Sequence, residues 1–180
     1  MNSEQIARSV DEIWDASIVP TLQRYIRIPN QSPLFDPDWK QNGHMHEAVA
    51  LAKSWVEEQQ IEGLRIETHE LKGRTPLIFI EVDGDDSSTV LMYGHLDKQP
   101  AMVGWEAGLG PWTPVLRDGK LFGRGGADDG YAIFAAISAI RAVKAQNAPH
   151  SRIVVIIECC EVSGSLGRPA YIELMSDRIG

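Results

Sequence analysis

The fold is decided by two apolar stretches, residues 77–97 (LIFIEVDGDDSSTVLMYGHLD) and residues 152–158 (RIVVIIE). Three runs within them, 77–82, 89–93 and 152–158, are too short for helices and rich in branched apolar residues, which is typical of buried strands. Residues 64–68 alternate apolar and charged side chains, which predicts a half-buried strand. We therefore expect these runs to form the strands of one sheet.

Helical periodicity fills the remaining segments. Apolar residues recur at helical spacing after Ser3, which we expect to cap the first helix, and Pro20 should kink or restart it. Further helices are predicted over residues 46–60, 129–145 and 169–175, and Asp118-Gly119 predicts a tight hairpin. Helices alternating with strands predict an α/β fold, with a mixed or mainly parallel sheet and helices on both faces.

Composition excludes several classes of protein. The 180 residues carry 17 Lys+Arg and 25 Asp+Glu, so the net charge is 17 − 25 = −8 and argues against nucleic-acid or anionic-membrane partners. No apolar run approaches the roughly 18 residues of a membrane span, and the amino terminus does not resemble a signal peptide. The adjacent Cys159 and Cys160 indicate neither a disulfide framework nor a zinc knuckle. We expect a cytoplasmic protein.

The first polar cluster follows the predicted strand 89–93. His95 and Asp97 are two residues apart, so in extended chain they share one face. Imidazole is the commonest metal ligand, and a neighbouring carboxylate can fix its tautomer and orientation. A surface histidine beside an acid is the plainer alternative.

The second cluster is the glycine-rich segment 123–130, GRGGADDG, which precedes an apolar helix. Such a loop can cradle phosphate, but Asp128 and Asp129 would repel an anion. A metal-binding aspartate on a tight turn is the better interpretation, although either residue could instead cap the helix.

The third cluster follows the strand 152–158. Glu161 lies at the end of this strand, before a Ser-Gly turn, where a carboxylate can serve as a general base. A solvated loop acid is the alternative.

In their order along the chain, these clusters resemble the M20 family of metallopeptidases, and most closely its dipeptidase and carnosinase-like branch. The resemblance rests on YGHLDKQP at 93–100, Trp105, GRG at 123–125, ADDG at 127–130, and Glu161 before SGS at 163–165. It covers nearly the whole chain.

This resemblance implies a di-zinc hydrolase that cleaves dipeptides or similar small amides. By motif, His95 would bind one metal ion, Asp97 would orient His95, and Asp128 would bridge the two ions. Glu161 would be the general base that acts on the metal-bound water, and Asp129 would support the loop. Two ions about 3.5–4 Å apart activate water and polarise the scissile carbonyl. Mn²⁺ or Co²⁺ would suit the same ligands.

Two departures from the family pattern qualify this expectation. A second glutamate, a metal ligand, follows the base in the family, whereas Val162 stands there in this sequence. Family members also continue further, with more ligands and an inserted dimerisation and lid domain. We therefore expect residues 1–180 to be the amino-terminal part of the catalytic domain, without the dimerisation domain. Because only His95 and Asp128 match metal-ligand positions, we expect weak zinc binding and slow or absent hydrolysis by this chain alone.

Three functional hypotheses follow. The first is an M20-type dipeptidase, and the second is a catalytically inactive remnant or binding subunit that keeps the fold, which Val162 favours. The third, a nucleotide-binding module, is opposed by Asp128 and Asp129.

We also expect an unpaired strand edge, with Trp105, Trp112 and the helix from Tyr131 only partly buried.

Overall fold

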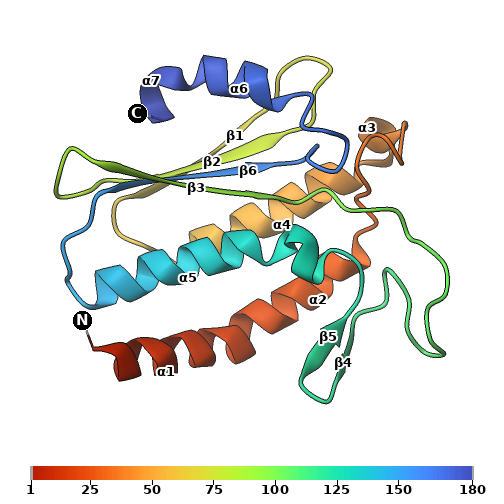
Figure 1. Cartoon of the computed structure of the whole chain (residues 1–180), viewed down its shortest axis with the longest axis horizontal. Helices are drawn as coiled ribbons and strands as arrows, with labels where there is room; N and C mark the ends of the chain where they lie inside the picture. Colours follow the sequence, from red (N-terminus) through yellow and green to blue (C-terminus); the bar gives the residue numbers. More distant parts are fainter. Residues whose placement is uncertain (1, 180) are drawn as a thin grey trace.

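A mixed four-stranded sheet lies at the centre of the computed structural model, which describes residues 2–179 (Figure 1). Its order is β1-β2-β6-β3, with β1 at Leu64–His69, β2 at Leu77–Val82, β6 at Arg152–Glu158 and β3 at Thr89–His95. The β1–β2 and β2–β6 pairs are antiparallel, and only β3–β6 is parallel. The sheet is therefore mixed rather than mainly parallel.

Helices cover both faces of this sheet, as predicted (Figure 1). Helices α4 (His44–Glu58) and α5 (Ala132–Ala145) lie against one face, and α6 (Arg168–Leu174) and α7 (Ser176–Ile179) lie over the other. Helix α1 (Ser3–Ile13) continues through a π-helical turn, Trp14–Ile18, into α2 (Val19–Arg27), beyond α5 in the view of Figure 1. Pro20, which has no N–H to donate, lies in the first turn of α2, directly after this π-helical turn.

Smaller elements complete the chain. Helix α3 (Trp39–Asn42) precedes α4, and β4 (Val115–Arg117) pairs with β5 (Lys120–Phe122) in the predicted hairpin. None of the helices within residues 2–179 has the length and apolar character needed to cross a membrane.

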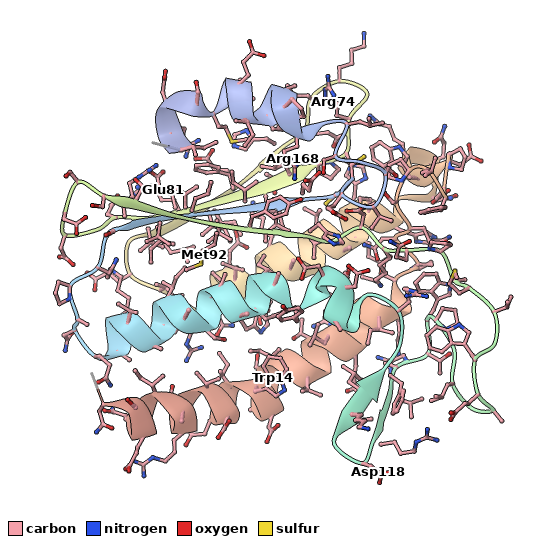
Figure 2. The ribbon with its side chains drawn as sticks, viewed as in Figure 1. Trp14, Arg74, Glu81, Met92, Asp118 and Arg168 are labelled. Atoms are coloured by element: carbon pink, nitrogen blue, oxygen red, sulfur yellow. The ribbon has the colours of Figure 1, made fainter. Side chains whose placement is uncertain are left out.

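The central strands have apolar side chains on both faces because helices cover both sides. Ile78, Ile80 and Val155 pack in the larger core with α4 and α5, where the rings of Trp55 and Phe134 meet edge to face at 4.6 Å. Their strand neighbours face α6 instead, in a second cluster made of Leu77, Phe79, Val154, Ile156, Tyr171 and Met175. Figure 2 shows Met92 between the sheet and α5, where it packs against the larger core. Continuous apolar runs are the result of this two-sided burial.

Several predictions about individual elements were wrong. Asn2, not Ser3, caps α1, because its extended backbone lets Oδ1 accept the N–H of Gln5 at 3.1 Å. Strand β3 is an edge strand and is not fully buried, so Val90, Leu91 and Tyr93 are exposed.

The helix from Tyr131 was expected to be partly buried, yet Ile133, Phe134, Ile137 and Ile140 of α5 lie in the core. Trp105 and Trp112 are half-buried, as predicted.

Candidate metal centre

The three polar clusters meet at one edge of the sheet. His95 is the last residue of β3, and it lies opposite Glu158, the last residue of β6, in the parallel pair. The loops that follow both strands therefore leave the sheet at the same edge. The turn Gly126–Gly130, at the start of α5, reaches this edge from the α5 side.

The close approach of this turn depends on Gly94. A Cβ atom at Gly94 would lie 2.6 Å from Cβ of Ala132 and 3.0 Å from Oδ2 of Asp129. The missing side chain lets α5 and its first turn pack directly on β3, and Asp129 Oδ2 accepts the backbone N–H of His95 at 3.2 Å.

The imidazole of His95 is held in one orientation. Its Nδ1 lies 2.9 Å from the carbonyl oxygen of Asp97 and 3.3 Å from the Oδ1 of the same residue. Because a carbonyl oxygen only accepts hydrogen bonds, Nδ1 carries the proton and donates it. Nε2 is directed toward two carboxylates, with Asp128 Oδ1 at 3.3 Å and Glu161 Oε2 at 3.6 Å. The four residues predicted from the sequence, His95, Asp97, Asp128 and Glu161, are thus brought together.

The two aspartates of the turn have different roles. Asp128 and Asp129 have non-helical backbone angles and are joined by a cis peptide bond. Neither caps α5, whose first residue follows Tyr131 without a side-chain cap, so the capping alternative is wrong. Asp129 holds β3 through the His95 N–H, and burial raises the pKa of its carboxyl. The Asp128 side chain is 59% exposed, which leaves its carboxylate open to solvent and to His95.

The electrostatics of this edge favour a cation. Burial by itself would lower the pKa of His95, but the hydrogen bond and charge of Asp97 and the charges of Asp129 and Glu161 together raise this pKa to about 9. The same negative field that stabilises a proton on Nε2 would stabilise a metal ion there.

The side chains fit one side of a metal site. An imidazole nitrogen and a carboxylate are ligands that zinc, manganese and cobalt all accept. Within residues 2–179, however, no group of three or more His, Cys, Asp or Glu side chains is arranged to hold a metal ion. His95 and Asp128 supply two donors. The side chain of Val162 offers none, and its backbone N–H donates to Asp97 Oδ2 at 3.0 Å.

Two groups near the site were missed from the sequence. Lys98 is fully buried, and its Nζ lies 2.7 Å from the carbonyl oxygens of both Tyr25 and Ile28. Its stem occupies the space that Gly125 leaves open, because a Cβ there would lie 2.5 Å from Lys98 Cε. This glycine, directly before the turn, is a signal in the sequence that a side chain packs closely there.

The second missed group surrounds Glu158. Its Oε1 accepts hydrogen bonds from the hydroxyls of Tyr93 and Ser165 and lies 3.3 Å from Arg168 Nη1. Figure 2 shows Arg168 on the α6 side of the sheet. The register of β3 against β6, which the sequence does not show, creates this cluster.

Comparison with known proteins identifies the family of this chain. The sequence model of Peptidase family M20/M25/M40 matches residues 91–180, which include all three polar clusters. The chain belongs to this family.

Curated relatives include two Beta-Ala-His dipeptidases. The Homo sapiens protein is 39% identical over 106 residues, which are 57% of this chain and 21% of that protein. The Mus musculus protein is 31% identical over 165 residues, which are 86% of this chain and 33% of that protein. The chain thus spans between about a fifth and a third of these relatives.

A solved structure matches almost the whole chain. Human carnosine dipeptidase 1 is 30% identical with a TM-score of 0.75, and the match covers 98% of this chain and 38% of that structure. The α/β architecture is therefore that of part of an M20 peptidase.

Proposed function

We propose that the edge formed by His95, Asp128 and Glu161 is part of a metal-dependent hydrolase centre for dipeptides or similarly small amides. The observation that carries this proposal is the approach of Asp128 and Glu161 to the same imidazole nitrogen, at 3.3 and 3.6 Å. Membership of the M20 family and the likeness to carnosine dipeptidase 1 support it. We also propose that residues 1–180 correspond to the amino-terminal part of an M20 catalytic domain.

The residues divide the chemistry between them. His95 and Asp128 would hold the metal ion, with zinc the first candidate and manganese or cobalt the alternatives. A bound divalent ion polarises the scissile carbonyl and lowers the pKa of water. Asp97 keeps Nδ1 protonated, so that Nε2 is the nitrogen that would release its proton and bind the ion. Glu161, whose side chain is 44% exposed, takes the proton of the attacking water and passes it to the leaving amine.

A second candidate function is that of an inactive binding subunit which keeps the M20 fold. Val162 favours it, because this position has no ligand atom in its side chain although its backbone is held against Asp97. The two candidates differ in whether adding one carboxylate creates or improves catalysis.

The test is hydrolysis of β-alanyl-histidine and a panel of other dipeptides with added zinc, manganese or cobalt. We expect slow turnover by the wild type, faster turnover by Val162→Glu, and loss of turnover when Glu161→Gln is added to that variant. No metal-dependent turnover in either the wild type or Val162→Glu would favour the binding subunit. Turnover that survives His95→Ala would refute the assigned site.

A further inference from the structure

The Asp97 carboxylate contacts more than the imidazole. It is fully buried, and its two oxygens accept consecutive backbone N–H groups of the loop after β6. Glu161 N lies 3.0 Å from Oδ1, and Val162 N lies 3.0 Å from Oδ2. The carboxylate of Asp97 therefore contacts the ring of His95, with Oδ1 3.3 Å from Nδ1, and also holds the backbone that carries Glu161.

These contacts are the kind that fix a loop in one position. Hydrogen bonds to an ionised carboxylate are about twice as strong as neutral ones. The two hydrogen bonds that Asp97 accepts are shielded from water because Asp97 is fully buried, and the low local dielectric strengthens them further. The two oxygens of the carboxylate accept one N–H each from two successive residues. The backbone at Glu161 is therefore fixed in its orientation as well as in its distance from Asp97.

The rest of the loop is held independently. The Ser165 hydroxyl donates to Glu158 Oε1 at 2.9 Å, and Ser163 Oγ accepts the N–H of Leu34 at 2.9 Å. Ser163 Oγ also lies 2.5 Å from Ser32 Oγ. These contacts lie after Glu161 in the chain, whereas Asp97 acts at Glu161 itself.

We propose that Asp97 is the positioning residue for Glu161, and that it sets the separation between the Glu161 carboxylate and His95 Nε2. The catalytic meaning of this role rests on the function proposed above. The structural role does not, because it concerns only how the loop after β6 is held against the end of β3.

Asparagine at position 97 is the most direct perturbation. Its side chain has nearly the same shape, but one of the two oxygens becomes an NH₂ group, which donates and cannot accept. One of the two loop N–H groups then faces another donor. Glu158→Gln is the matched control, because it changes a second buried carboxylate at the same sheet edge that contacts Ser165 rather than the backbone of Glu161.

The first measurement is amide hydrogen exchange by NMR on the metal-free full chain. We expect the amides of Glu161 and Val162 to exchange slowly in the wild type and in Glu158→Gln. In Asp97→Asn they should exchange about 10- to 100-fold faster, as loss of a hydrogen bond to a charged group implies. Amides of the sheet core should be unchanged in both variants. Equal exchange at Glu161 and Val162 in the wild type and Asp97→Asn would overturn the proposal. If Asp97→Asn does not fold, the wild type alone is decisive, because unprotected amides at these two positions would also overturn it.

The second measurement separates positioning of Glu161 from orientation of His95. In the Val162→Glu background, Asp97→Asn should lower kcat with little change in KM, and it should cost little more once Glu161→Gln is present. Multiplicative losses would mean that Asp97 acts only through His95. Should no variant show turnover, the function proposed above fails, while the exchange result still decides the positioning role.

Discussion

Lys98 provides a sharp test of how the interior beneath the site is built. Its Nζ makes two hydrogen bonds of 2.7 Å, to Tyr25 and Ile28, and lies 3.9 Å from the centroid of the Tyr25 ring. A third, longer contact of 3.5 Å joins Nζ to the carbonyl oxygen of Ile26. Burial lowers the pKa of Lys98 from 10.5 to about 6, so the amine is largely neutral in the folded protein near pH 7.

The sign and size of the resulting pH dependence follow from linkage. Between the folded pKa and the unfolded pKa, the unfolded chain binds more protons, so the free energy of unfolding rises with pH. At 1.36 kcal/mol per pKa unit, raising the pH from about 6.5 to about 8.5 should add about 2.5 kcal/mol through Lys98 alone. His95 acts in the opposite direction: its raised pKa of about 9 contributes stability at low pH that is lost as the pH rises through that value.

Urea unfolding of the wild type and Lys98→Met at the two pH values separates these contributions. His95 is present in both proteins and cancels in their difference. We expect the stability of the wild type relative to Lys98→Met to increase by about 2.5 kcal/mol between the lower and the higher pH. Lys72→Met, at an exposed lysine, controls for the loss of a positive charge. If the difference in stability between wild type and Lys98→Met is the same at both pH values, burial does not lower the pKa of Lys98.

Two further predictions concern the other face of the sheet. The Tyr171 hydroxyl donates to the carbonyl of Thr75 at 2.7 Å and accepts the N–H of Leu71 at 2.9 Å. Because Tyr171→Phe removes both hydrogen bonds, it should lower the free energy of unfolding by about 1–3 kcal/mol. The control variant Tyr131→Phe, at an exposed tyrosine, should leave the free energy of unfolding unchanged. Equal stability of the two variants in urea would contradict this. Two hydrogen bonds from Arg178 lower the pKa of Glu67, so its contribution is present above about pH 4.5 and lost as the pH falls. The measurement is the loss of the free energy of unfolding between pH 7 and about pH 3.5. Because the Glu67 side chain is 42% exposed, Glu67→Gln should reduce this loss by less than about 1 kcal/mol. An equal loss in wild type and Glu67→Gln would argue against a contribution from the Glu67–Arg178 pair.

The strands and the site edge were predictable because local pattern determines them. Short apolar runs such as Ile153–Ile157 have few alternatives to a buried strand. Polar residues directly after two such strands must meet if the strands are parallel neighbours, which is the case for His95 and Glu161.

Other features depend on contacts between distant segments. Lysine is ordinarily a surface residue, and Lys98 is buried only because α2 presents carbonyl oxygens and Gly125 leaves space. The exposure of β3 depends on the strand order, which places β6 on one side of it and no strand on the other within residues 2–179. The hydrogen bonds of Asp97 to Glu161 and Val162 likewise join residues 64 and 65 positions apart.

Zinc stoichiometry, measured after dialysis of the purified chain against micromolar zinc, tests the proposed metal site at His95. Wild type, Val162→Glu, and Val162→Glu combined with His95→Ala would be compared. We predict little retained zinc in the wild type, clear retention in Val162→Glu, and loss of that zinc when His95 is also replaced. Zinc retained equally in all three proteins would contradict the assignment of His95 and the importance of Val162.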